Sequence, residues 1–228
     1  MFNPILMLLA LGFGLGSQIS DTSSLGTEDY LHFVGPGVLA GTAVLQGGLY
    51  SLWPTMAQLR WEGTYQPVIR TPCSPLEVAV GHLLWVGLRV TFSSAFFLLV
   101  LLLGIGWSGF LALAAAPLAG LTAIAVAAPV AAFCSRQETD LGFSFVSRMI
   151  LTPLFVFSGT FTLVESLPSA VQAIVKVTPG YHGIEIVRGL INDTISAAGA
   201  ASHVGVLLLW VVVGGAATIS GFRKALTP

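Results

Sequence analysis

The stretch VTFSSAFFLLVLLLGIGWSGFLALAAAPLAGLTAIAVAAPVAAFCS, residues 90–135, contains no Asp, Glu, Lys or Arg. A helix that crosses the hydrocarbon core of a bilayer needs about 20 mostly apolar residues, and this stretch is about twice that length. The segment Gly104-Ile-Gly106-Trp-Ser-Gly109 lies within it and carries the glycines that are typical of a turn. We therefore expect two membrane helices, residues 80–103 and 110–133, joined as a tight hairpin.

The composition of the whole chain agrees with a membrane protein. Of the 228 residues, 55% are hydrophobic and only 8% are charged, whereas a soluble domain carries about 25% charged residues. The backbone of a membrane span must satisfy its own hydrogen bonds, which favours helices. We predict an all-α, polytopic membrane protein that forms a single domain over residues 1–228.

Four further apolar runs complete a set of six predicted spans. The first lacks the positive start and the cleavage pattern of a signal peptide, so we expect it to be retained as a helix. The additional spans are residues 2–19, 33–53, 143–161 and 203–221. An even number of spans places both termini on one side of the membrane.

The positive charges predict which side that is. Cytoplasmic loops carry an excess of Lys and Arg. With both termini in the cytoplasm, seven of the nine basic residues lie inside or near inner helix ends, and only Lys176 and Arg188 lie outside. We therefore place both termini and the loop at residues 54–78 in the cytoplasm.

The segment at residues 165–193 separates the fifth and sixth predicted spans. Its two apolar pieces, residues 167–175 and 181–191, are too short to cross a membrane, and Thr178-Pro179-Gly180 divides them. This pattern predicts a re-entrant hairpin of short helices on the outer side. The candidate functional residues in and before it are Ser158, Gly159, Pro168, Pro179, His182, Glu185, Arg188 and Gly189.

Three of these candidates are spaced three residues apart. His182, Glu185 and Arg188 would share one helix face, where Glu185 can pair with Arg188. Two interpretations stay open: the charges shape the exit of a transport path, or they form a local ion pair that stabilises the hairpin.

The run from Ser158-Gly159-Thr-Phe through Leu167-Pro168 and Thr178-Pro179 to Val187-Arg188 resembles a signature of ABC-2 type exporter permeases. Two further stretches, Gly35-Pro36-Gly37 and Thr71-Pro72-Cys-Ser-Pro75, are similar to the same family. The most similar patterns are those of permeases for lipo-oligosaccharides and for daunorubicin-type drugs.

This resemblance implies the membrane subunit of an exporter in the cytoplasmic (inner) membrane. Such a subunit moves an amphiphilic substrate, for example a drug, a lipid or a glycolipid, and pairs with a second copy or a paralogue. A separate ABC ATPase subunit would bind ATP-Mg, and this chain has no GxxxxGK[ST] phosphate loop. We expect no enzyme activity, no cofactor on this chain and no nucleic-acid partner. The alternative is a secondary transporter or channel without an ATPase.

The loop after the second span mixes charges with aromatic side chains: Arg60, Trp61, Glu62, Thr64 and Tyr65. By resemblance, this loop is the coupling segment that contacts the ATPase. The alternative is that its aromatic residues anchor the chain at the membrane interface and that Arg60 sets the topology.

Two more arginines, Arg89 and Arg148, lie within or near predicted spans, where a charge is a candidate functional residue. Because both are expected near inner helix ends, the simpler interpretation is that they extend to the lipid headgroups. Four scattered histidines and two separate cysteines show no metal-ligand spacing, so no metal site is expected.

Overall fold

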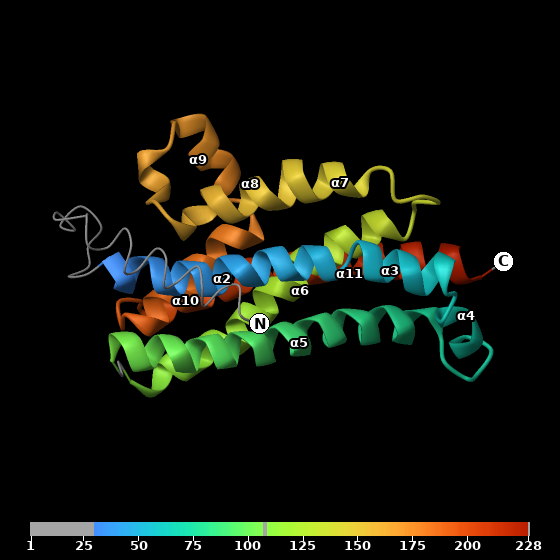
Figure 1. Cartoon of the computed structure of the whole chain (residues 1–228), viewed down its shortest axis with the longest axis horizontal. Coiled ribbons are helices and arrows are strands. Elements are labelled where there is room, and N and C mark those ends of the chain that lie inside the picture. Colours follow the sequence, from blue (N-terminus) through green and yellow to red (C-terminus); the bar gives the residue numbers. More distant parts are fainter. Residues whose placement is uncertain (1–29, 107–108, 228) are drawn as a thin grey trace.

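The computed structural model describes residues 30–106 and 109–227, so the predicted span at residues 2–19 lies outside the described part of the chain. Within these ranges every regular element is a helix, which confirms the prediction of an all-α fold. Four of these helices are long: α2 (Tyr30–Tyr50), α5 (Pro75–Ile105), α6 (Ala115–Cys134) and α11 (Ala197–Leu226). Helices α2, α5 and α11 run along the long axis of the molecule, and α6 crosses between them obliquely (Figure 1).

Shorter elements connect these helices. The segment after α2 contains α3 (Trp53–Met56), the π-helical turn η3 (Ala57–Trp61) and α4 (Tyr65–Val68). The 3-10 turn η4 (Phe110–Ala114) leads into α6. A fifth segment follows α6 and alternates α-helical with π-helical turns: α7 (Phe143–Phe145), η5 (Val146–Leu151), α8 (Thr152–Phe155) and η6 (Val156–Thr160). The chain then forms η7 (Val164–Ser166), α9 (Ser169–Val175) and α10 (Pro179–Ile191).

Among the described residues, four helical stretches are long and apolar enough to cross a membrane: Pro75–Gly104, Phe110–Cys134, Phe143–Thr160 and Ala197–Leu226. They coincide with the predicted third to sixth spans. Helix α2 has sufficient length but is less apolar, because glycines, Pro36 and Gln46 interrupt its hydrophobic residues.

Helices α5 and α11 are longer than the apolar runs that predicted them. A capping box starts α5: Ser74 Oγ accepts a hydrogen bond from the Glu77 N–H, and the Glu77 carboxylate accepts one from the Ser74 N–H. Ser196 caps α11 in a similar way through the Gly199 N–H. Since these caps lie outside the apolar runs, hydropathy alone places both helix starts several residues too late.

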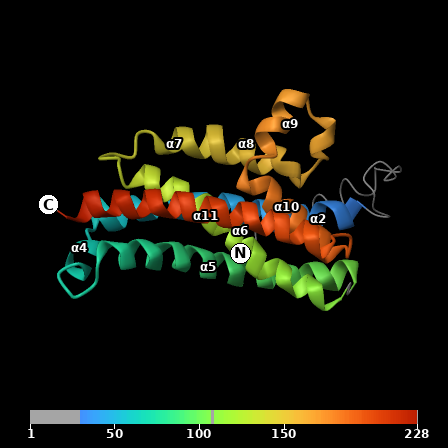
Figure 2. The same ribbon diagram turned by 180° about the vertical axis from the view of Figure 1, so that it is seen from behind.

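The short helices gather at the two ends of the bundle. Helices α9 and α10 lie at one end, whereas α3, α4 and the C-terminal end of α11 lie at the other (Figures 1 and 2). The predicted coupling segment and the predicted hairpin are therefore at opposite ends of the molecule.

Helix α6 forms the centre of the bundle and packs against α2, α5, α10 and α11. Many of its residues are fully buried alanines, and the neighbouring helices approach it with glycines. A Cβ atom on Gly47 of α2 would lie 2.4 Å from the Ala123 carbonyl oxygen, and one on Gly214 of α11 would lie 2.8 Å from Pro129 Cδ. Small residues permit this close approach of helix backbones in membranes.

We predict that Gly47→Ala destabilises the protein by about 1–3 kcal/mol, because the new methyl group meets backbone atoms of α6 that cannot move aside. The control is Gly81→Ala in α5, where a Cβ atom has no neighbour within 4 Å. That control is expected to be neutral or to gain up to about 1 kcal/mol from helix propensity. Thermal unfolding in detergent measures both, and equal midpoints for the two variants would contradict the close packing.

Candidate functional site

A sharp turn ends the fifth segment and begins the site at the hairpin end. Gly159 has φ of +98°, a conformation that side-chain-bearing residues rarely adopt. Ser158, Gly159 and Thr160 are all buried in this turn. The turn directs the Gly159 carbonyl away from the helical hydrogen-bond pattern and makes it available to another element.

Arg188 of α10 binds that carbonyl. Its side chain is 11% exposed. It donates from Nη2 to the Gly159 carbonyl, from Nε to the Phe33 carbonyl at 3.3 Å and from Nη1 to Glu185 Oε1 at 2.9 Å. The guanidinium also lies over the Phe33 ring, with Cζ 4.0 Å from the ring centroid. Arg188 thus joins α10 to the start of α2 and to the end of the fifth segment, and the predicted Glu185–Arg188 pair is confirmed.

Glycines of α2 bring that helix onto the same turn. A Cβ atom on Gly37 would lie 2.4 Å from the Thr160 carbonyl oxygen, and one on Gly41 would lie 2.7 Å from Thr160 Oγ1. Gly180 of α10 meets the turn from the other side, since a Cβ atom on it would lie 2.7 Å from Ser158 Oγ, whereas Gly189 of α10 packs against Ile195. The turn is therefore held between α2 and α10 with little free space.

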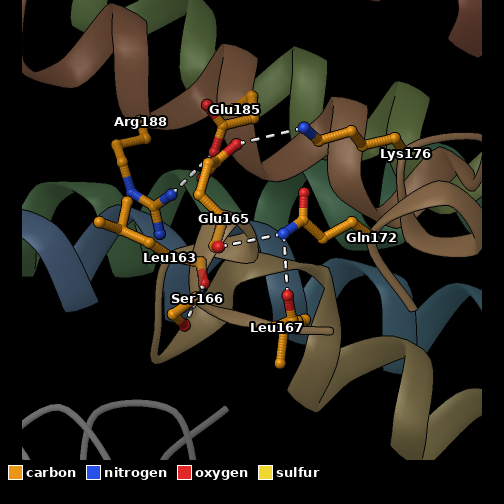
Figure 3. Close-up of polar contacts among 8 residues, drawn as sticks. All are labelled: Leu163, Glu165, Ser166, Leu167, Gln172, Lys176, Glu185 and Arg188. Atoms are coloured by element: carbon orange, nitrogen blue, oxygen red, sulfur yellow. Dashed lines mark hydrogen bonds and ion pairs between the residues drawn. The ribbon is translucent and has the colours of Figure 1, made fainter. Parts of the chain in front are cut away.

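A second, more exposed set of contacts closes the hairpin itself (Figure 3). Lys176 Nζ lies 3.4 Å from Glu165 Oε1, and Gln172 Nε2 donates to the carbonyls of Glu165 and Leu167. Pro168 precedes α9, and Pro179 is the first residue of α10. These contacts are local, whereas Arg188 connects distant parts of the chain.

His182 faces α11 rather than Glu185. Its Nε2 donates to the Lys176 carbonyl at 2.9 Å, and its Nδ1 lies 2.8 Å from Nδ1 of His203. With Nε2 protonated, His182 Nδ1 accepts a hydrogen bond from the Nδ1–H of His203, so two neutral rings satisfy this contact. Burial, followed by the nearby His203, holds the pKa of His182 below its ordinary value, while the Lys176 carbonyl and Glu185 act in the opposite direction.

The opposite end of the bundle holds the predicted coupling segment, and Tyr65 points inward there. The Tyr65 hydroxyl donates to Gln58 Oε1 and lies 3.0 Å from His82 Nδ1, and His82 Nε2 lies 3.0 Å from Thr55 Oγ1. The Tyr65 ring also packs on Phe222 of α11, with centroids 5.9 Å apart. Burial raises the pKa of Tyr65 to about 12, so the phenol stays neutral and can keep this hydrogen bond.

The other residues of the predicted coupling segment face outward. Arg60, Trp61, Glu62 and Thr64 are exposed, and Trp61 is 56% exposed. The Glu62 N–H donates to the Ala57 carbonyl and closes the π-helical turn η3. The predicted set therefore divides into an outward-facing group and one anchoring residue, Tyr65.

Arg89 and Arg148 occupy different environments. Arg89 lies deeper in its helix than expected, near the middle of α5, because α5 begins at Pro75. Its guanidinium carbon lies 4.2 Å from the centroid of the Tyr50 ring. Arg148 is exposed on η5, near the start of the fifth segment.

Sequence reasoning missed Thr55, Gln58, His82 and His203. His82, Trp85 and Arg89 are spaced three and four residues apart and therefore lie on one face of α5. This helical spacing in the sequence could have predicted that face.

An apolar cavity of about 560 Å³ lies between α6, the fifth segment and α11. Its lining is almost wholly hydrophobic and includes Val126, Val130, Phe133, Leu151, Leu154 and Trp210. A cavity of this size and lining suits the apolar part of a ligand.

The chain is similar to known transport proteins over most of its length. The family model described as "ABC-2 type transporter" matches residues 1–192. Nodulation protein J of Rhizobium meliloti (strain 1021) is 23% identical over 99% of this chain and 85% of its own length, and the Nodulation protein J of Bradyrhizobium diazoefficiens is 26% identical over 98% and 84%. The "Daunorubicin resistance ABC transporter permease protein DrrB1" of Streptomyces coeruleorubidus is 28% identical over 84% of this chain and 66% of its own length. No solved structure gave a significant match.

We predict that Arg188→Ala destabilises the protein by about 3 kcal/mol, because Glu185 and two buried carbonyls lose their donor together. Thermal unfolding in detergent measures the loss. The matched control is Lys176→Ala, which removes an exposed ion pair and is expected to change stability by less than about 1 kcal/mol. Equal effects of the two variants would refute the connecting role of Arg188.

The contact between His182 and His203 predicts a pH dependence. Because the pKa of His182 is lowered in the folded state, folding favours the neutral ring; this stabilisation is complete above the unfolded pKa of about 6.5 and is lost as the pH falls below it. The thermal midpoint of the wild-type protein should therefore fall between pH 7 and pH 5. His182→Gln should reduce that fall, and an unchanged pH profile in this variant would contradict the assignment.

Proposed function

Because the chain belongs to the ABC-2 type transporter family, we propose that it is the membrane subunit of an exporter driven by a separate ABC ATPase. The chain would provide the membrane path, and the partner would bind ATP-Mg. A second copy, or a related permease, would complete the path. As a transport subunit, the chain would need no catalytic residues of its own.

We infer a six-span arrangement in the cytoplasmic (inner) membrane with both termini in the cytoplasm. The spans would be residues 2–19, α2 and the four apolar stretches described above. This orientation places the segment α3–η3–α4 in the cytoplasm and the hairpin α9–α10 on the outer side. It is supported by the basic residues of the predicted inner loops and by the position of the two segments at opposite ends of the bundle.

The main support for the proposal is that the coupling segment has an exposed group of residues and one residue, Tyr65, that anchors it to the bundle. Trp61 and its charged neighbours face outward and are available to a partner, while Tyr65 anchors the same segment to α5 through His82 and to α11 through Phe222. A force applied at Trp61 would therefore reach two long helices directly. Exposed tryptophans and arginines are favoured contact residues in protein interfaces.

An amphiphilic substrate fits the chemistry of the path. The cavity beside α6 would accept apolar groups, and the permeases that resemble this chain include one named for daunorubicin resistance. The hairpin, held to α2 by Arg188, would border the outer exit. A secondary transporter would more commonly carry several charges within its spans, and the described spans contain few.

The test is purification of the tagged chain from its native membrane, followed by an ATPase assay. We expect an ATPase subunit to co-purify in stoichiometric amount. Trp61→Ala and Glu62→Ala should lower the association or the ATPase activity of the complex by about tenfold or more, because they remove exposed contacts at the centre of the coupling segment.

The matched control is Glu138→Ala, which changes an exposed carboxylate in the loop after α6 and should leave the complex intact. Thermal unfolding should be unchanged in all three variants, since none of these side chains is buried. A chain that purifies without any ATPase would reject the proposal and favour the secondary transporter.

A further inference from the structure

A small polar pocket lies beside the middle of α5. Its volume is about 90 Å³, and it is lined by the end of α2, the α3–η3 segment and α5. The side chains that give it chemistry are Tyr50, Gln58, His82, Trp85 and Arg89. A water molecule occupies about 30 Å³ in the liquid, so the pocket has room for a small polar group and not for a lipid chain.

Arg89 is the charged group of this pocket, and no carboxylate of the described residues pairs with it. Its guanidinium stacks on Tyr50, and both ion pairs found in the described ranges involve other residues. An arginine within a membrane span is unfavourable unless an anion or water reaches it. Arg89 is exposed and pairs with no carboxylate of residues 30–106 and 109–227, so it is open to an anionic partner from outside them.

A second copy of the described residues does not offer that partner. The acidic side chains of residues 30–106 and 109–227 all lie in loops, in the hairpin or in the first turn of α5, away from the middle of any long helix. They are Glu62, Glu77, Glu138, Asp140, Glu165, Glu185 and Asp193. Within the described part of the chain no carboxylate is placed to serve Arg89, and an anion from a ligand or from the bilayer can fill this role.

The surface next to the pocket indicates what kind of anion this is. Leu88, Phe92, Phe96 and Leu99 form an exposed apolar stripe on α5 that begins beside Arg89, and Phe92 is 70% exposed. A cationic pocket adjoining an apolar stripe matches a molecule with an anionic head and hydrocarbon chains. The planar guanidinium is well suited to phosphate oxygens, which it can bind through two parallel hydrogen bonds.

We propose that Arg89, with Tyr50 and Gln58, binds the phosphate headgroup of an anionic membrane amphiphile whose chains lie along the apolar stripe of α5. The same chemistry is found in a phospholipid of the bilayer and in an exported phosphate-bearing amphiphile. Trp85 also lines the pocket, one helical turn before Arg89 and therefore on the side of the head that faces away from the apolar stripe.

The pocket shares two residues with the cluster that anchors the coupling segment. Gln58 accepts the Tyr65 hydroxyl, and His82 lies between Tyr65 and Thr55. A phosphate would accept a hydrogen bond from the Gln58 Nε2–H group, while Oε1 of the same amide accepts one from the Tyr65 hydroxyl. A bound headgroup would therefore fix the orientation of the amide that holds Tyr65. This last step rests on the proposed function: occupancy of the pocket would stabilise the seating of the coupling segment and hence affect the ATPase.

Binding is measured on the purified full-length chain in dodecyl maltoside, without the ATPase, by titration with dihexanoyl phosphatidylglycerol. Arg89→Gln should weaken binding by about tenfold or more, because a charged hydrogen bond is lost, and Arg89→Lys should retain part of it. The matched control is Arg148→Gln, an exposed arginine outside the pocket, which should bind as the wild type does. Thermal unfolding of Arg89→Gln and Arg89→Lys verifies that both are folded.

Unchanged binding in Arg89→Gln would overturn the proposal. Equal affinity for dihexanoyl phosphatidylcholine would overturn the requirement for a net negative headgroup, and equal affinity for inorganic phosphate would overturn the role of the apolar stripe. Because this titration contains no ATPase, a negative result leaves the exporter assignment intact, and a missing ATPase partner does not affect the titration.

Mass spectrometry of amphiphiles that co-purify with the wild type and with Arg89→Gln identifies the source. A phospholipid lost in the variant supports the site and assigns it to the bilayer, and another anionic amphiphile lost in the variant supports the site and assigns it to the exported substrate. If no amphiphile depends on Arg89 for its retention, the proposal is wrong.

Discussion

The close approach of neighbouring backbones to α6 is the constraint on which the rest of this structure depends. Inside a bilayer the apolar effect does not drive helices together, since lipid chains are as apolar as leucine, and van der Waals contact must hold them. Helix α6 is rich in buried alanine, and α2, α5, α10 and α11 each place a glycine against it. Substituting a larger residue at one of these glycines separates a helix from the centre and displaces the segment that this helix carries.

The two ends of the bundle depend on this centre in different ways. At the hairpin end, Gly183 of α10 approaches Thr122 of α6, and Arg188 then fastens α10 to α2 and to the Gly159 turn. At the coupling end, Tyr65 lies between α5 and α11. Arg188 pairs with Glu185 and donates to two backbone carbonyls, whereas Arg89 has no carboxylate partner among the described residues. Arg188 therefore has a structural role, and Arg89 is the arginine that we propose binds a ligand.

The features that the sequence predicted correctly are local in the chain. The all-α fold follows from the length of the apolar runs, and the Glu185–Arg188 pair follows from three-residue spacing on one helix. The resemblance to ABC-2 permeases was carried by short motifs and is confirmed by the family model. Each of these signals is contained within a few turns of helix.

The features that were missed join residues far apart in the chain. Arg188 binds the Phe33 carbonyl, His182 meets His203, and His82 meets Thr55. Periodicity shows which face of a helix is polar but not which other helix that face meets, so these partners were hidden. The inward orientation of Tyr65 was missed for the same reason, because its neighbours in sequence are exposed.

The distribution of π-helical turns indicates where this bundle can change shape. Helices α5 and α11 are regular over their whole lengths, whereas π-helical turns occur in η3 of the coupling segment and in η5 and η6 of the fifth segment. Such turns hold one more residue per hydrogen-bonded loop and are frequent at functional sites. In the proposed coupling role, a displacement of the segment α3–η3–α4 would tilt α5 and α11 as rigid rods, because Tyr65 contacts His82 of α5 and Phe222 of α11. The fifth segment borders the apolar cavity and ends at the Gly159 turn. Its π-helical turns would let it bend when α5 and α11 tilt by different amounts.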